Sequence, residues 1–257
     1  MTNKPEIVLV GAGNLATQLG TTLKENGFSI VCVYSRTINS AKELGELLDA
    51  PYTNQLEKIP TNAGLYIFAI NDDALSGLLT DFPKTTGIWV HTAGSLPVSI
   101  FEPHTKHYGV IYPLQTFSKH RKINFRDIPI FIEASQEQGM TLLTDLAQNI
   151  SDKVIPLSSE KRKFYHLAAV FACNFSNHMY TLASETLEQQ NLDWEFLKPL
   201  ILETASKIEK TSPQKAQTGP AIRYDRKIID KQLELLKDDK SKQELYEKIS
   251  QSIHHKQ

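Results

Sequence analysis

The sequence predicts an α/β protein in which a doubly wound parallel sheet is followed by an all-α domain. Three observations predict it. Short apolar runs alternate with helical patterns up to residue 157, the strand signals stop beyond that point, and 257 residues suffice for two separate cores. We therefore expect one domain at residues 1–157 and a second, all-helical domain at residues 158–257.

The first domain is predicted from its alternation of strands and helices. Several strand candidates are continuously apolar, as expected when helices cover both faces of a sheet. The expected strands are Glu6–Val10, Ser29–Tyr34, Leu65–Ile70, Gly87–His91, His107–Ile111, Pro129–Glu133 and Lys153–Pro156. The expected helices between them are Asn14–Asn26, Ser40–Leu48, Asp73–Thr80 and Gln136–Ile150. This order predicts right-handed crossovers.

The second domain is predicted from helical periodicity alone. Four helices are expected, at Ser158–Gln190, Trp194–Gln217, Ala221–Leu236 and Lys240–Ile253. Gly219 and Pro220 separate the second helix from the third, in the usual order of Gly after one helix and Pro at the start of the next.

Composition and charge exclude several classes of protein. Lys and Arg total 28 and Asp and Glu total 29, so a net charge of -1 gives no general attraction to nucleic acid or an anionic membrane. No apolar run approaches the ~20 residues of a membrane span, and no signal segment precedes the first strand. We expect a cytoplasmic protein. Cys32 and Cys173 lack metal-ligand spacing, and no metal is expected.

The strongest motif lies between the first strand and the first helix. Gly11-Ala12-Gly13-Asn14-Leu15-Ala16 is a G-x-G-x-x-A fingerprint. The first Gly makes the tight turn, the second lets the backbone approach a pyrophosphate, and the Ala allows close packing of helix on strand. The free N–H groups at the helix start would bind that pyrophosphate. The motif predicts a Rossmann dinucleotide-binding domain; the alternative is a Rossmann-like domain that has lost its ligand.

The end of the second strand indicates which dinucleotide binds. NAD enzymes usually carry an acid there, whereas this chain has Ser35-Arg36-Thr37. Arg36 could pair with a 2′-phosphate or stack on the adenine, and Ser35 and Thr37 could donate hydrogen bonds. We therefore predict NADP(H). The alternative is that Arg36 is an ordinary surface cation.

Two later loops also follow strands and so lie where ligands bind in open α/β sheets. Asn71 could cap the next helix or touch the cofactor. His91 and Thr92 are further candidates for cofactor binding, and Ser95 is a candidate for substrate binding. For Thr92 and Ser95, ordinary turn chemistry is the alternative.

At this point the sequence resembles a known family, in which a Rossmann-like domain precedes a helical domain of unknown function and whose members are labelled NADP oxidoreductases. The motifs that carry the resemblance are Gly11–Ala16, His91–Ser95, Pro113–Phe117, Thr218-Gly219-Pro220 with Arg223 and Asp225, and the helix around His166–Phe175. The family is distantly similar to pyrroline-carboxylate reductases, β-hydroxyacid dehydrogenases and ketopantoate reductases. The resemblance implies a helical domain that binds substrate and forms dimers.

This chain departs from the family pattern at two positions. Tyr112 stands where His is expected before the Pro-Leu-Gln motif, and Tyr224 stands where Gly is expected. Both changes argue against proton transfer by those loops.

The candidates for catalysis lie on the first helix of the second domain. His166, Val170, Cys173 and Asn177 share one helical stripe, and Asn174 lies beside it. His166 could donate a proton and Asn174 could orient the substrate. The β-hydroxyacid dehydrogenases use Lys and Asn on the equivalent helix, so the analogy is incomplete. The alternative is a hydrogen-bonded core histidine.

Gln115, Arg223 and Asp225 complete the candidate substrate contacts, together with Ser95. Arg223 and Asp225 could reach a substrate carboxylate in their own subunit or in the partner, or they could form a salt bridge that fixes the third helix.

The predicted function is an NADP(H)-dependent oxidoreductase that transfers hydride between nicotinamide and a small carbonyl or imine compound, in a cleft between the domains. The alternative is a non-catalytic NADP(H)-binding sensor. We also expect a homodimer through the helical domain, because that domain has more apolar side chains than a small bundle covers. Those side chains could instead pack on the first domain. No nucleic-acid or membrane partner is expected.

Overall fold

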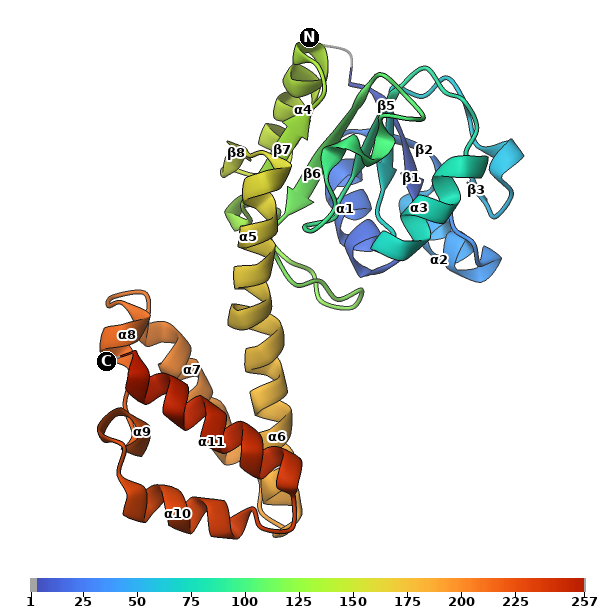
Figure 1. Cartoon of the computed structure of the whole chain (residues 1–257). Coiled ribbons are helices and arrows are strands. Elements are labelled where there is room, and N and C mark those ends of the chain that lie inside the picture. The colour runs from blue at the N-terminus through green and yellow to red at the C-terminus, as the bar shows by residue number, and fades with distance from the viewer. Residues whose placement is uncertain (1–3, 257) are drawn as a thin grey trace. The chain divides into compact units, whose positions relative to one another are not determined.

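The computed structural model describes residues 4–256, which form two compact units (Figure 1). The Rossmann unit ends at Cys173 and the helical unit begins at Asn174. The predicted change from strands to helices near residue 157 precedes this division, because helix α5 (Ser159–Ala169) belongs to the Rossmann unit.

The Rossmann unit contains an eight-stranded sheet with the order β3-β2-β1-β4-β5-β6-β7-β8. Its strands are β1 (Glu6–Val10), β2 (Ser29–Tyr34), β3 (Tyr52–Thr53), β4 (Leu65–Phe68), β5 (Ile88–His91), β6 (Tyr108–Pro113), β7 (Ile130–Ala134) and β8 (Val154–Pro156). The predicted fold class is confirmed, with one difference. β7 pairs with β6 in the antiparallel sense, while the other neighbouring strands are parallel. The two-residue strand β3 is too short to show an apolar run, so the sequence did not reveal it.

Helices cover both faces of this sheet, which explains why its strands are continuously apolar. The helices are α1 (Asn14–Glu25), α2 (Ile38–Leu48), α3 (Asp72–Asp81), α4 (Glu137–Ile150) and α5, with short 3₁₀ turns at Leu56–Lys58, Val98–Phe101 and Phe125–Asp127. Leu9 of β1 packs in a core with side chains of α1, α2 and α4. Its neighbour Val8 packs on the opposite face with α3 and an aromatic group that includes Phe68, Trp89 and Phe101.

Helix α5 continues through a π-helical segment, Val170–Phe175, into α6 (Ser176–Glu188). A π-helical turn contains more residues than an α-helical turn, and such segments are frequent at functional sites. The segment shifts the helical register, so the predicted stripe from His166 to Asn177 does not continue as a regular α-helical face. The sequence contains no Pro or Gly here to signal the change.

The helical unit contains more and shorter helices than predicted. Besides α6 they are η5 (Trp194–Leu197), α7 (Lys198–Lys207), α8 (Pro213–Ala216), α9 (Pro220–Arg223), α10 (Arg226–Leu235) and α11 (Lys240–His255). The expectation of unbroken helices at Trp194–Gln217 and Ala221–Leu236 was wrong. Pro213 starts α8 after a Ser212 cap, and Tyr224 ends α9 in the left-handed conformation (φ 50°) before Asp225 caps α10. Across residues 4–256, no helix has both the length and the apolar content to cross a membrane.

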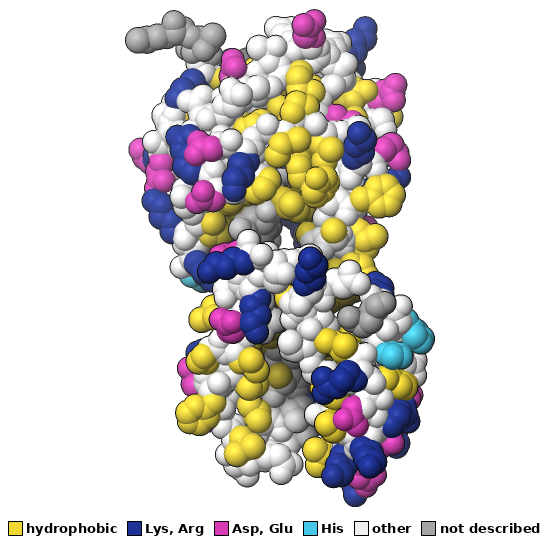
Figure 2. Space-filling view, turned by 90° about the vertical axis from the view of Figure 1, so that its left-hand side faces the viewer, with side chains coloured by type: hydrophobic (Ala, Val, Ile, Leu, Met, Phe, Trp, Pro, Cys, Tyr) yellow, Lys and Arg dark blue, Asp and Glu magenta, His cyan; other side chains and the backbone are white. Residues whose placement is uncertain are grey.

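The helical unit leaves large apolar side chains on its surface, where Figure 2 shows hydrophobic groups among charged ones. These exposed residues are Phe175, Tyr180, Leu192, Phe196, Leu200, Leu202, Ile208, Ile228, Leu235 and Ile249. Among the described residues of this unit, only Ala221 and Ile229 are fully buried and apolar.

Candidate cofactor and active site

Gly11 forms a turn that no other residue fits. Its φ is +120°, and an added Cβ would lie 2.3 Å from the carbonyl oxygen of Ala69. Its N–H donates to the carbonyl of Tyr34 at 2.7 Å. Strand β1 lies between β2 and β4, where the strand order reverses, and the turn leaves β1 at its carboxyl end. This is the position at which open α/β sheets bind their ligands.

Gly13 leaves open space at the start of helix α1. It is exposed, and an added Cβ would meet no atom within 4 Å, so a ligand can approach the backbone there. No side chain caps the helix, and its first turn carries no acid. The uncapped N–H groups and the positive end of the helix dipole suit a pyrophosphate.

The other positions of the fingerprint support this cradle. Ala12 and Ala16 are buried, Leu15 is half-buried and Asn14 is exposed. The small side chain of Ala16 packs in the same core as Leu9, which brings the helix close to the sheet. The residues present therefore fit a dinucleotide.

The loop after β2 presents Arg36 to solvent. Among the described residues Arg36 has no acidic partner within ion-pair distance, and its side chain is free to meet a phosphate. The N–H of Ser35 donates to the carbonyl of Thr53 at 3.2 Å, which fixes the loop. Thr37 precedes helix α2 and its hydroxyl does not cap that helix.

The loops after β4 and β5 contain exposed and buried candidates. Asn71 is exposed at the start of α3, and its side chain makes no cap. The Thr92 hydroxyl is buried and donates to the carbonyl of Phe68 at 3.4 Å. Thr92 therefore has a structural partner, while Asn71 remains available to a ligand.

His91 is fully buried and keeps a neutral ring. Its Nδ1 accepts the N–H of Ala93 at 3.1 Å, and among the described residues its Nε2 makes no hydrogen bond of normal geometry. Burial, and next the positive charge of Arg162, lower the pKa of His91 to about 3, although the Pro97 carbonyl opposes the shift. The enclosed ring holds the start of the following loop through the N–H of Ala93.

His166 lies directly over that loop. An added Cβ on Gly94 would lie 2.5 Å from His166 Nδ1, so only Gly leaves room for the imidazole. The hydroxyl of Tyr112, on β6, lies 3.0 Å from the same Nδ1. Burial raises the pKa of Tyr112, with the Arg162 charge opposing, and the phenol therefore stays neutral. These three residues come from β6, α5 and the loop after β5.

A buried arginine fixes the positions of these elements. Arg162 is only 1% exposed and pairs with Glu133 of β7 at 2.7 Å. Its guanidinium also donates to the carbonyls of Ala93 (3.2 Å) and Leu96. Ser159 donates to the same Glu133 carboxylate at 2.6 Å and accepts from the Arg162 guanidinium. The network joins helix α5, the sheet and the loop that carries Gly94.

Two predicted substrate contacts lie on loops that follow β5 and β6. Ser95 is exposed, and its hydroxyl donates to the carboxylate of Asp72 at the start of α3. Gln115 is exposed, and its side-chain oxygen accepts the N–H of Thr116 at 2.8 Å. Both side chains have local partners.

The other predicted residues belong to the helical unit. Asn174 is exposed and is the first residue of that unit. Arg223 is exposed, and Asp225 accepts the N–H of Ile228 as the cap of α10. The salt bridge proposed between Arg223 and Asp225 is absent from the structure, in which both residues are described.

Sequence reasoning missed three residues of this site. Tyr112 was noted only as a departure from the family pattern, yet its hydroxyl contacts His166. Gly94 lay within a motif but had no assigned role. Arg162 follows Lys161 in a charged stretch that is typical of a solvated helix face, so no sequence signal distinguished it.

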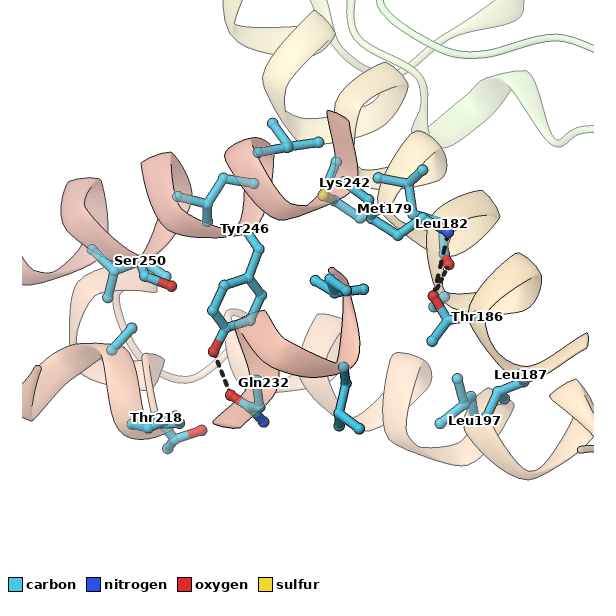
Figure 3. Close-up of a pocket in the computed structure, with 18 residues that line it drawn as sticks. Met179, Leu182, Thr186, Leu187, Leu197, Thr218, Gln232, Lys242, Tyr246 and Ser250 are labelled. Carbon is cyan, nitrogen blue, oxygen red and sulfur yellow. Dashed lines mark hydrogen bonds between the residues drawn. The ribbon is translucent and has the colours of Figure 1, made fainter. Parts of the chain in front are cut away.

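The helical unit contains an apolar cavity of about 650 Å³. Figure 3 shows its polar groups: Tyr246 donates to Gln232, and Lys242 lies beside Thr186 at 3.5 Å. Lys242 also pairs with Glu185 at 3.4 Å. Its own partners satisfy the ammonium, so the cavity offers mostly apolar surface. Within residues 4–256 no group of three or more His, Cys, Asp or Glu side chains is placed to hold a metal ion.

Comparisons with known proteins agree with this architecture. Residues 2–116 match the Rossmann-like domain family, and residues 128–253 match the domain of unknown function DUF2520. A solved Bacteroides fragilis structure, whose name assigns it to the NADP oxidoreductases, is 49% identical, covers 98% of both chains and has a TM-score of 0.95. A Thermotoga maritima protein is 26% identical over 97% of this chain and 98% of its own, with a TM-score of 0.82. No curated protein matched the chain.

A more distant structure shares the fold alone. It is an imine reductase from Myxococcus stipitatus in complex with NADP+, with a TM-score of 0.65, 12% identity, and coverage of 98% of this chain and 92% of that one.

The fold and the glycine turn define a Rossmann protein with a helical C-terminal part. The chain belongs to the family of the Bacteroides fragilis protein, and its own sequence carries a Rossmann-like domain followed by DUF2520. The resemblance predicted from the sequence is therefore confirmed.

Proposed function

We propose that this protein is an NADP(H)-dependent oxidoreductase that reduces, or forms, a small carbonyl or imine compound. One observation carries the proposal: the cradle formed by Gly11, Gly13 and the uncapped start of α1, at the point where the strand order reverses. The assigned class of the 49% identical protein supports it.

The chain's own residues have separate tasks in this proposal. The start of α1 binds the pyrophosphate, and Asn71 binds the dinucleotide further along the same edge. When bound, the cofactor supplies or accepts hydride. His166 is the group that donates to the substrate heteroatom, through an N–H of its ring. The predicted substrate position, a cleft between the domains, stays a prediction.

The preference for NADP(H) over NAD(H) depends on Arg36. Its exposed guanidinium can pair with a 2′-phosphate, and the end of β2 carries no acid that would repel one.

Titration of purified protein with NADPH and with NADH, followed by cofactor fluorescence, tests the proposal. We expect tighter binding of NADPH, and Arg36→Ala should weaken NADPH binding about tenfold while leaving NADH binding unchanged. Arg126→Ala is the matched control, since Arg126 is also an exposed arginine of the Rossmann unit but lies in the loop before β7. Absence of binding to either cofactor would refute the proposal.

A panel of carbonyl and imine compounds then separates an enzyme from a sensor. Oxidation of NADPH by the protein with any of these compounds supports the enzyme, and His166→Gln should lower that rate. Binding of NADPH without turnover across the panel favours the alternative, a non-catalytic NADP(H) sensor.

We further propose that the protein is a cytoplasmic homodimer that associates through the helical unit. The exposed Phe196 and Leu235 and the apolar cavity beside α6 and α11 support this assembly, because a two-fold partner would cover them. Light scattering should give about twice the 29.0 kDa of one chain; a mass of one chain would contradict the dimer.

A further inference from the structure

The Tyr112–His166 pair is unusual because a neutral phenol, rather than a carboxylate, contacts the imidazole. The Tyr112 hydroxyl and His166 Nδ1 lie 3.0 Å apart, and the two rings meet edge to face. Tyr112 also stacks on Phe131 of the neighbouring strand, which fixes the phenol ring. The position of the hydroxyl is therefore set by the sheet and not by solvent.

The direction of this hydrogen bond follows from the available partners. Within the described chain, the Tyr112 hydroxyl has His166 Nδ1 as its hydrogen-bond partner. A half-buried hydroxyl loses free energy when its hydrogen is unpaired, so we assign the O–H as the donor and Nδ1 as the acceptor. A neutral imidazole that accepts at Nδ1 must carry its own proton at Nε2.

The position of the His166 imidazole is also fixed by its neighbours. Gly94 lies against the ring, where any side chain would clash with Nδ1. Arg162 holds the loop at the carbonyls of Ala93 and Leu96, and its charge is paired with Glu133. Tyr112 of β6 therefore contacts the imidazole directly, while Arg162, one turn earlier on the same helix, is paired with Glu133 of β7.

We infer that Tyr112 is a positioning residue that holds His166 as its neutral Nε2–H tautomer, so that the Nε2–H group donates a hydrogen bond to the substrate heteroatom. This inference rests on the proposed function for its role in catalysis, but the tautomer itself is a property of the free protein. It gives a function to the departure from the family pattern at residue 112. Tyr112 acts through His166 and need not contact substrate.

Nuclear magnetic resonance of ¹⁵N-histidine-labelled protein, without cofactor, tests the inference at neutral pH. The chain has eight histidines, and His166→Gln identifies the signals of His166. We expect Nε2 to show the shift of a protonated nitrogen and Nδ1 that of an unprotonated nitrogen that accepts a hydrogen bond. In Tyr112→Phe, the Nδ1 signal should move to that of a nitrogen without this bond, and the Nε2 hydrogen should exchange faster with water.

Tyr165→Phe is the matched control. Tyr165 also packs on Phe131, at 4.6 Å between ring centroids, and belongs to the same helix as His166, but its hydroxyl does not bond the imidazole. Its removal should leave the His166 signals unchanged. A proton on Nδ1 in the wild-type protein, or unchanged His166 signals in Tyr112→Phe, would overturn the inference. Failure of NADPH binding would refute the proposed function and leave this result standing.

Discussion

The Rossmann unit and the helical unit differ in how completely they bury their apolar side chains. Val8, Ile67 and Val90 in the sheet are completely buried, and the charge of Arg162 beneath the loops is paired. The helical unit instead leaves Phe196 81% exposed and Leu235 84% exposed. The Rossmann unit encloses a large core, although it also exposes Leu47, Phe164 and Phe171, whereas the helical unit buries few apolar side chains and exposes many.

This difference indicates how each unit gains free energy from the burial of apolar surface. Apolar burial contributes roughly 25 cal/mol for each Å² removed from water, so the closed core of the Rossmann sheet stabilises that unit from within one chain. A unit of short helices with open apolar side chains gains that free energy only when another surface covers it. The difference can be tested by changing comparable residues in the two units.

The largest expected effect follows removal of Arg162. Arg162→Met leaves the Glu133 carboxylate without its ion-pair partner and the Ala93 and Leu96 carbonyls without the guanidinium donors. Breaking one side of a buried ion pair costs about 3–5 kcal/mol of unfolding free energy. Urea unfolding followed by circular dichroism measures the loss.

The helical unit supplies the control for Arg162. Arg226 pairs with Asp230 at 2.9 Å, but both side chains are about half exposed. Arg226→Met should destabilise the protein far less than Arg162→Met, because solvent screens an exposed ion pair. Equal losses in the two variants would show that the buried network is not what stabilises the Rossmann unit.

The second prediction concerns acid stability of the Rossmann unit. His91 has a pKa of about 3 in the folded protein, against 6.5 for an ordinary histidine. Between these values the unfolded chain binds the extra proton, so stability is full above pH 6.5 and falls as the pH decreases toward 3. The slope reaches about 1.4 kcal/mol per pH unit below pH 6.5, so lowering the pH from 6.5 to 4.5 should cost about 2 kcal/mol through this group.

Replacement of His91 isolates this contribution. His91→Gln should be less stable at neutral pH but should lose less on acidification than the wild-type protein. Urea unfolding at several pH values between 4.5 and 7 measures the two slopes. Identical slopes would mean that His91 takes up no proton on unfolding in this range.

How far the sequence predicted the two units also differs. In the Rossmann unit, the apolar runs and the fingerprint located seven of the eight strands and the glycine turn, because buried strands and phosphate turns impose strong local patterns. In the helical unit, periodicity predicted helices correctly but not their breaks. Tyr224 adopts a left-handed conformation that the sequence favours only weakly for Tyr.

The sequence predicted those site residues whose amino-acid type alone suggests a role. Gly11 and Gly13 were found from their motif, and His166 from its chemistry. Arg162 and Tyr112 act through residues that lie far away in the sequence: the separation is 29 residues between Arg162 and Glu133 and 54 between Tyr112 and His166. Such pairs depend on the folded chain, and a single sequence carries no local signal for them.

The third prediction tests whether a second copy covers the helical unit. Leu235 lines the apolar cavity and is exposed, so Leu235→Glu should place a charge in the proposed dimer interface and weaken association by about 2 kcal/mol or more. Leu47→Glu is the matched control, because Leu47 is an exposed leucine on α2 of the Rossmann unit. Light scattering at micromolar concentration should show dissociation only for Leu235→Glu. Equal masses for both variants would contradict the proposed interface.

The smallest effects are expected at two residues with almost the same strained backbone. Asp49 ends α2 with φ 48°, and Tyr224 ends α9 with φ 50°. Gly adopts this conformation without the steric cost that a side chain pays, and it is the usual residue at such helix ends. The Asp49 side chain is 97% exposed and its pairing with Lys24 is long at 3.9 Å, so Asp49→Gly should raise the unfolding free energy by about 0.5 kcal/mol.

Tyr224→Gly should bring no such gain, because the Tyr224 ring has partners to lose. It stacks on His254 at 4.9 Å, and Arg226 lies over its face at 5.4 Å. Aromatic and cation–π contacts of this kind contribute about 0.5–1.5 kcal/mol each, which offsets the relief of strain. Differential scanning calorimetry of the two variants separates these cases. A gain for Tyr224→Gly as large as that for Asp49→Gly would show that the ring contacts of the helical unit contribute little, so that backbone strain alone decides both positions.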